Sequence, residues 1–136
     1  YGVTTVEVKS GYGLDLKNEL KILEVIAEAK KLQPVGLVAT FLGAHVVPPE
    51  FKGSSRKYLR FLMEEVLPKV VGKAEFVDIF CEKKAFSARE SKKYLKFAKS
   101  LGFKLKMHAE QIKLRVPPRP TSSGAWLRRP RRGPRT

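Results

Sequence analysis

The sequence predicts an α/β fold in which parallel β-strands alternate with α-helices, as in part of a (β/α)8 TIM-type barrel. Short apolar segments typical of buried strands alternate with segments of helical periodicity, and the links between them are short. Most of the expected strands end in polar or glycine-containing sequences, as in a barrel whose strands bring their carboxyl ends together. A complete barrel has about 250 residues, so we expect about four of its parallel strands, with the intervening helices.

The first half of the chain contains two expected strands with a helix between them. Residues 4–9 are rich in β-branched side chains, which favours a strand. Asp15 is placed to cap a helix over residues 16–32, where apolar side chains recur every three or four residues. Pro34 ends this helix. The almost wholly apolar residues 36–42 predict a strand covered on both faces.

The second half repeats the same alternation. Apolar residues on one side predict a helix over residues 55–67, which Pro68 ends or kinks. Residues 76–81 form the third expected strand. Residues 87–90 have the Ser-x-x-Glu pattern of a capping box, so a third helix begins there, with a glycine at its expected C-terminal end. Residues 103–107 form the fourth expected strand.

Basic residues are distributed unevenly. The net charge of +15 and the pI of about 10.2 at first suggest a nucleic-acid-binding protein. Seven of the ten arginines, however, lie in residues 115–136, which hold no acidic residue, and without them the net charge is +8. In residues 1–114, lysines mix with glutamates as on solvated helix faces. The body and the tail are therefore compositionally different segments.

Cysteine and apolar content indicate where the protein resides. The single cysteine, Cys81, excludes an internal disulfide and suits a reducing compartment. The longest uncharged run, around residues 35–47, is too short to span a membrane. The first residues do not have the layout of a signal peptide. We therefore expect a cytoplasmic protein with no membrane partner.

The first residue is Tyr1 rather than Met, so we expect the chain to be a segment of a longer protein.

Three residues at the ends of expected strands are candidates for binding. His108 is a candidate metal ligand or catalytic base, and the alternative is a structural hydrogen-bonding role; the same alternatives apply to His45. Tyr12 stands between two glycines that let a ligand approach the backbone, although an exposed turn has the same pattern. A catalytic zinc or iron site needs about three or more protein ligands. With two histidines and one cysteine, the chain cannot complete a site of that kind.

The third expected strand offers three further candidates. Glu82 at its end is a better candidate for an active-site carboxylate than Asp78, which lies inside the strand and has a structural alternative. We expect Cys81 to be an inert, buried thiol, because nothing nearby in the sequence indicates an activated nucleophile.

Four motifs extend these observations to a family. They are VEVKSGYGL at residues 6–14, TFLGAHVVPPE at residues 40–50, VDIFCE at residues 77–82 and HAEQ at residues 108–111. In order and spacing they resemble imidazolonepropionase, a member of the amidohydrolase superfamily that acts in histidine degradation. The first two motifs are far more specific than a histidine alone.

The resemblance implies a hydrolase that acts on a cyclic amide C–N bond. The expected reaction opens 4-imidazolone-5-propanoate with water to give N-formimidoyl-L-glutamate and uses a divalent zinc or iron ion. By the same resemblance, His108 is the metal ligand at the end of the fifth barrel strand, and Tyr12, His45 and Gln111 contact the substrate. Some members have Glu at the position of Gln111. The side-chain amide of Gln111 cannot take up a proton, so Gln111 is not assigned as a catalytic base. No other residue of this chain is assigned as catalytic.

The resemblance also implies parts that this chain does not contain. These are a His-x-His pair on the first barrel strand, an arginine on the following loop and an aspartate on the last strand. We therefore expect the isolated chain to bind catalytic metal weakly or not at all, and to be inactive. The parent enzyme is a possible homo-oligomer, and nucleic acid is not an expected partner.

The resemblance divides the chain into two segments, at residues 1–112 and 113–136. The first is a segment of a metal-dependent hydrolase barrel, and the second is a tail rich in arginine and proline that we expect to be disordered or translated out of frame. The alternative function is a small basic module that binds nucleic acid through this tail. Deleting the tail, or finding in the DNA another frame that restores a glycine-containing helix, would separate these interpretations.

Overall fold

The computed structural model describes residues 2–51, 53–82 and 85–109. Their order is β1 (Thr5–Lys9), α1 (Leu16–Leu32), β2 (Gly36–Ala44), the 3-10 turn η1 (Pro49–Phe51), α2 (Ser55–Phe61), the π-helical segment η2 (Leu62–Val66), α3 (Leu67–Val70), β3 (Phe76–Cys81), α4 (Ala88–Ser100), β4 (Lys104–Leu105) and β5 (His108–Ala109). Gln111 and the expected tail at residues 113–136 lie outside the described residues.

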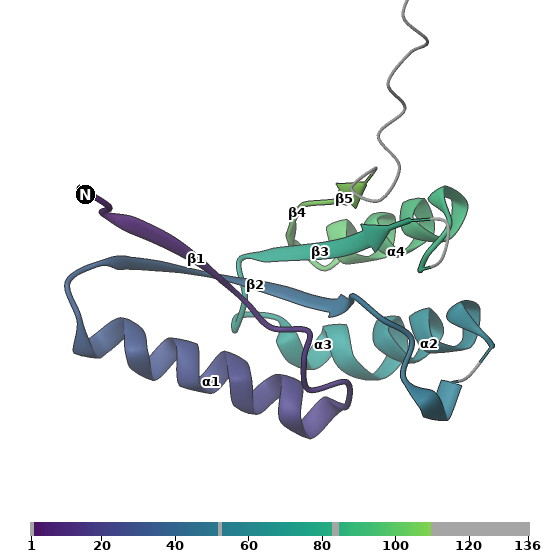
Figure 1. The fold of residues 1–136 in the computed structure, drawn as a ribbon, viewed down its shortest axis with the longest axis horizontal. Coiled ribbons are helices and arrows are strands. Elements are labelled where there is room, and N and C mark those ends of the chain that lie inside the picture. Colours follow the sequence, from purple (N-terminus) through teal and green to yellow (C-terminus); the bar gives the residue numbers. More distant parts are fainter. Residues whose placement is uncertain (1, 52, 83–84, 110–136) are drawn as a thin grey trace, which may run out of the picture.

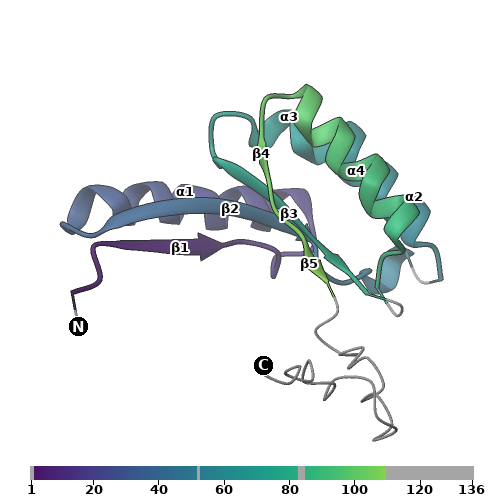
Figure 2. The same cartoon turned by 90° about the horizontal axis from the view of Figure 1, so that it is seen from above.

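The strands form one parallel sheet. Its order is β1-β2-β3-β4, and β5 also pairs with β3. Figure 1 shows the alternation of strands and helices along the chain, and in Figure 2 the helices lie on one side of the sheet. Parallel strands with helices on a single face are the arrangement of a (β/α)8 barrel wall, whose other face points into the barrel. The predicted fold class, a partial TIM-type barrel, is confirmed.

Local capping signals set the bounds of two helices. The Asp15 side chain accepts a hydrogen bond from the backbone N–H of Asn18 at 2.8 Å, and α1 has the predicted range. Ser87 and Glu90 form the predicted capping box of α4. Gly102 follows this helix with a φ of +92°, a left-handed conformation that favours glycine. In both helices a short polar side chain satisfies a free backbone donor of the first turn.

Three predicted elements differ from those observed. The second helix was predicted to end near Leu67, but it continues to Val70 through the π-helical segment η2. Pro68 has no N–H and its ring crowds the carbonyl of an α-helical turn, and a wider π turn relieves both problems. The fourth strand is divided into β4 and β5, both paired with β3. Strand β2 is fully buried only over residues 40–44, and residues 36–39 are half-buried on both of its faces.

The core lies between the sheet and the helices. Along β3, Val77 and Ile79 alternate with Asp78, so the two apolar side chains pack among the helices while the carboxylate points to the other face. The largest fully buried apolar side chains include Tyr58, Tyr94, Phe41, Phe86, Leu23 and Leu62. No helix among the described residues is long and apolar enough to cross a membrane.

Candidate functional site at the carboxyl ends of the strands

Three of the four predicted site residues lie at one end of the sheet. Tyr12 follows β1, His45 follows β2 and His108 begins β5. The rings of Tyr12 and His45 meet edge to face with centroids 5.4 Å apart, and His45 meets Phe80 in the same way at 6.0 Å. Phe80 is the register partner of His108. The fourth predicted residue, Gln111, lies outside the described part of the chain.

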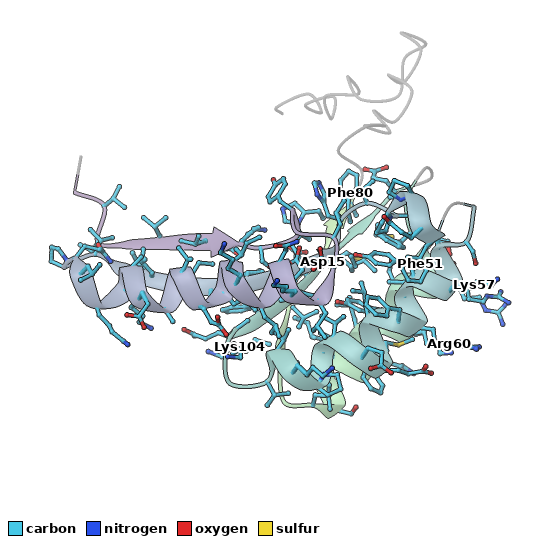
Figure 3. All side chains as sticks on the ribbon, turned by 90° about the horizontal axis from the view of Figure 1, so that it is seen from below. Asp15, Phe51, Lys57, Arg60, Phe80 and Lys104 are labelled. Carbon is cyan, nitrogen blue, oxygen red and sulfur yellow. The ribbon has the colours of Figure 1, made fainter. Side chains whose placement is uncertain are left out.

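Phe80 connects the two halves of this site. In Figure 3 it lies at the end of the sheet opposite Lys104, in agreement with the pairing of Lys104 with Phe76 at the start of β3. Because Phe80 touches the ring of His45 and pairs with His108, the three predicted residues lie in one connected group at the carboxyl ends of the strands. This is the arrangement that a barrel active site requires.

Glu19 fixes the loop that carries Tyr12. Its buried carboxylate accepts hydrogen bonds from the backbone N–H groups of Gly11 at 2.8 Å, Gly13 at 2.7 Å and Leu14 at 3.2 Å. Gly11 has a φ of +109°, and a Cβ there would lie 2.2 Å from a backbone oxygen of β2. The loop is therefore tied to the first turn of α1, while the Tyr12 side chain projects outward with 73% of its surface exposed.

Asp78 is the centre of a charged network on the sheet face opposite the helices. Its Oδ2 atom lies 2.7 Å from Lys9 Nζ and 2.7 Å from His108 Nδ1, and its Oδ1 atom accepts the backbone N–H of Ile79 at 2.8 Å. Lys9 Nζ also lies 3.3 Å from His108 Nε2. Asp78 is fully buried. A buried carboxylate needs such partners, because an unpaired charge in the interior is strongly unfavourable.

Glu7 and Lys106 extend this network across the sheet. Lys106 Nζ lies 2.7 Å from Glu7 Oε1, and the Thr40 hydroxyl donates to the same oxygen at 2.6 Å. Burial alone would raise the pKa of Glu7, but the hydrogen bonds from Lys106 and Thr40, with the charge of Lys9, hold it below the ordinary value of 4.5. The network therefore pairs two carboxylates with two ammonium groups.

Asp78 and Cys81 have surroundings that the sequence did not specify. Asp78 contacts His108, because the alternation of β3 turns it to the same face. The ranking of Glu82 above Asp78 as an active-site carboxylate stays a prediction. Cys81 is half-buried rather than buried, since it lies at the open end of β3. Its pairing with Ala109 brings it no candidate base.

The described residues supply one candidate metal ligand rather than a complete site. Among them, no three histidine, cysteine or acidic side chains come together in a way that could hold a metal ion. His108 is nevertheless a candidate for one coordination bond, because Nδ1 faces a carboxylate and Nε2, which lies 3.3 Å from Lys9 Nζ, is the nitrogen that could bind a cation if Lys9 moved aside. Any further ligands would come from outside the described residues.

A cavity of about 350 Å³ lies on the helical side of the sheet. Its lining includes Arg56 and Arg60 from α2, and Arg89 and Lys93 from α4. Figure 3 shows Arg60 pointing away from the end of the sheet where Phe80 lies. This cavity is therefore separate from the group formed by Tyr12, His45 and His108.

Comparison with known proteins shows which proteins the chain is similar to. No family model matches the chain. Curated relatives named imidazolonepropionase are 55% identical in Bacillus cytotoxicus, 50% in Treponema denticola and 52% in Streptococcus sanguinis, each over 114 residues and 82% of this chain. The chain is similar to one segment of each of these imidazolonepropionases. It spans 27–28% of the length of these relatives, so the predicted resemblance to part of that enzyme is confirmed.

Several residues of the site were not predicted. They are Glu7, Lys9 and Lys106 in the charged network, Glu19, which holds the Tyr12 loop, and Phe80, which touches His45. The two residues of β1 could have been found from alternation, since Glu7 and Lys9 fall on the face opposite Val8, which packs against the core. No local sequence signal identifies Glu19, because its partners lie in a preceding loop with an irregular backbone.

Proposed function

We propose that this chain is a working part of an imidazolonepropionase that opens the ring of 4-imidazolone-5-propanoate with water to give N-formimidoyl-L-glutamate. The reaction would take place in the cytoplasm, as a step of histidine degradation. The observation that carries the proposal is the connected group of Tyr12, His45 and His108 at the carboxyl ends of parallel strands. The name of the relatives and their identity of 50–55% support it.

His108 is proposed as one ligand of a divalent zinc or iron ion. Its ring begins β5 at the open end of the sheet and is about one third exposed, so a further group can reach it. When bound, such a cation would supply water activation at neutral pH. The contribution of this chain is to hold the imidazole in place through Asp78 and to leave the ring accessible from the end of the sheet.

Tyr12, His45 and Gln111 are proposed to contact the substrate. The exposed phenol of Tyr12 and the half-buried ring of His45 meet at an edge, and both can exchange hydrogen bonds with the polar groups of an imidazolone ring. The loop bound by Glu19 would keep the Tyr12 hydroxyl in position. The role of Gln111 follows from the motif alone, and its amide can bind a substrate but cannot take up a proton.

The isolated chain is proposed to be inactive. The 136 residues include two histidines and one cysteine, and of the histidines we assign only His108 to the metal. The other ligands, and any homo-oligomer contacts of the whole enzyme, would belong to parts of the protein outside this segment. Residues 113–136 are proposed to be a separate tail that does not contribute to the barrel.

A chimera tests this function. Residues 1–112 would replace the corresponding segment of the Bacillus cytotoxicus relative, and formation of N-formimidoyl-L-glutamate would be followed by mass spectrometry. We expect turnover by the chimera, loss of bound metal and activity in a His108→Ala chimera, and no turnover by the 136-residue chain. A folded, metal-loaded chimera that leaves the substrate unchanged would contradict the proposed function, and turnover by the isolated chain would contradict the missing ligands.

A further inference from the structure

We infer that Asp78 and Lys9 are positioning residues that hold the imidazole of His108 with its proton on Nδ1 and its lone pair on Nε2. The three side chains come from different strands. Asp78 Oδ2 lies 2.7 Å from both Lys9 Nζ and His108 Nδ1, and Lys9 Nζ lies 3.3 Å from His108 Nε2. Each ring nitrogen of His108 therefore faces a different charged group.

The chemistry of these neighbours determines which nitrogen carries the proton. An ammonium group only donates hydrogen bonds, so Nε2 must accept from Lys9 with its lone pair. An ionised carboxylate only accepts, and a lone pair on Nδ1 at 2.7 Å from it would be repelled, so Nδ1 carries the hydrogen even though the contact is not aligned as a hydrogen bond. The two contacts require the same tautomer. It is the reverse of the form that predominates for a free histidine side chain in water.

Burial makes this arrangement difficult to exchange for another. Asp78 is fully buried, and the Nδ1 atom of His108 is also shielded from solvent. The contact between Nδ1 and Oδ2 is short but bent, so it does not have the alignment of an ideal hydrogen bond. A ring turned the other way would place Nε2–H against a buried carboxylate and Nδ1 against an ammonium. The backbone N–H of Ile79 on Oδ1 keeps the carboxylate from rotating to follow it.

The surrounding charges support the same geometry. Lys9 also lies 3.6 Å from Glu7, which is itself bound by Lys106. Lys9 is thus held from two sides by carboxylates, and its ammonium remains beside Nε2. Lys9 and Asp78 come from strands separated by β2, so the fold of the sheet creates this pair rather than any local sequence.

The consequence for metal binding rests on the proposed function. A histidine that binds a metal offers a nitrogen lone pair, and its other N–H is usually held by a carboxylate or carbonyl. Asp78 would fix the ring in that orientation before a cation arrives. Lys9 would keep Nε2 unprotonated and would have to give way to the cation. The tautomer itself does not depend on this role.

Nuclear magnetic resonance of the 136-residue chain tests the tautomer without metal or substrate. Long-range proton–nitrogen spectra at about pH 8.5, two units above the ordinary imidazole pKa, distinguish protonated from unprotonated ring nitrogens. The chain has two histidines, so a His45→Gln variant assigns the signals of His108. We expect Nδ1 to be protonated and Nε2 unprotonated. A His108 ring with its proton on Nε2 in the folded chain would overturn the inference.

Variants separate the positioning role from general stability. Asp78→Asn and Lys9→Met should both shift His108 toward the Nε2–H form, whereas Lys9→Arg keeps a group that only donates and should retain the original tautomer. The matched control is Lys104→Met, because Lys104 lies on the same sheet but 68% exposed and paired with Glu75. Equal nitrogen shifts in Lys9→Met, Lys9→Arg and wild type, with folding confirmed by the amide spectrum, would contradict the role of Lys9.

A second measurement applies if the isolated chain or its Asp78 variant does not fold. In the chimera described above, Asp78→Asn should weaken metal binding by about 10- to 100-fold in competition with a chelator, as for other residues that orient a ligand histidine, and Lys104→Met should not. Unchanged metal affinity in Asp78→Asn would overturn the positioning role. Absence of turnover in a chimera that still binds metal through His108 would count against the proposed function alone.

Discussion

The bond between Glu19 and the Tyr12 loop gives the sharpest test of how this site is held together. The carboxylate is 1% exposed and accepts three backbone N–H groups, from Gly11, Gly13 and Leu14. Leu14 has a φ of 60°, a left-handed conformation that is unfavourable for a residue with a Cβ. The three hydrogen bonds therefore stabilise a loop whose backbone would otherwise relax.

The expected loss on replacing Glu19 by Ala follows from these contacts. The N–H of Gly11 is buried, and leaving it without a partner costs about 2 kcal/mol. The N–H groups of Gly13 and Leu14 are partly buried and can recover some hydrogen bonding from water, at about 0.5–1 kcal/mol each. Glu19→Ala should therefore lower the free energy of unfolding by about 3–4 kcal/mol. Glu19→Gln keeps one accepting oxygen and should lose about half as much.

Urea denaturation followed by circular dichroism measures this loss. The control is Glu24→Ala on the same helix, because Glu24 is 62% exposed and lies 3.4 Å from Lys73 in a surface ion pair. Such a pair contributes at most about 1 kcal/mol, so the control should have a nearly unchanged midpoint. In the chimera, Glu19→Gln should also raise the KM by releasing Tyr12. Equal destabilisation by Glu19→Ala and Glu24→Ala would refute the reasoning.

Three further predictions use the same structure. Tyr58→Phe should lower the free energy of unfolding by about 1 kcal/mol, because the buried Tyr58 hydroxyl donates a hydrogen bond at 2.9 Å to a carbonyl of β2. Tyr94→Phe should not lower it, since the Tyr94 hydroxyl has no hydrogen-bond partner among the described residues. Equal urea midpoints for the two variants would contradict this prediction. Gly11→Ala should cost about 3 kcal/mol in the same assay, because the new Cβ would lie 2.2 Å from a backbone oxygen at a φ of +109°. Hydrogen bonds from Ser87 hold the pKa of the Glu90 carboxyl below its ordinary value of 4.5. The ionised carboxylate therefore stabilises the fold fully above pH 4.5, and this stabilisation is lost as the pH falls through the lowered pKa. Glu90→Gln should therefore be less stable than wild type at neutral pH and approach it between about pH 5 and pH 3, and a difference that grows on acidification would contradict the assignment.

Elements with local signals were the ones that the sequence predicted well. Asp15 and the Ser87–Glu90 capping box act within a few residues, so the bounds of α1 and α4 could be predicted from the chain alone. The π turn before Pro68 and the division of the last strand depend on how each segment meets its neighbours in space. The predicted residues Tyr12, His45 and His108 followed from the ends of strands, which the parallel topology brings together.

The charged network could not be predicted from the sequence in the same way. Lys9, Asp78 and His108 are separated by up to 99 residues, and only the register of the sheet makes them neighbours. Alternation along each strand does predict which residues share a face. It does not predict which carboxylate meets which imidazole, because that depends on distances between strands. Glu82 was favoured over Asp78 because it lies at the end of the strand, and this preference stays a prediction.

The composition of the two sheet faces is the final argument for a barrel segment. The face away from the helices carries Glu7, Lys9, Asp78 and Lys106, which are paired with one another two to two, together with His108. Charges paired in this way tolerate enclosure, because each has a partner of opposite sign once water is removed. Apolar side chains meanwhile remain exposed along the two edges of the described sheet, at Val3, Val6, Leu105 and Met107. A neighbouring strand on each edge would cover them, and edges of this kind favour association when they stay open. Exposed apolar side chains on both edges are expected of a sheet that has a further strand on each side, and the paired charges on the face away from the helices can be enclosed there.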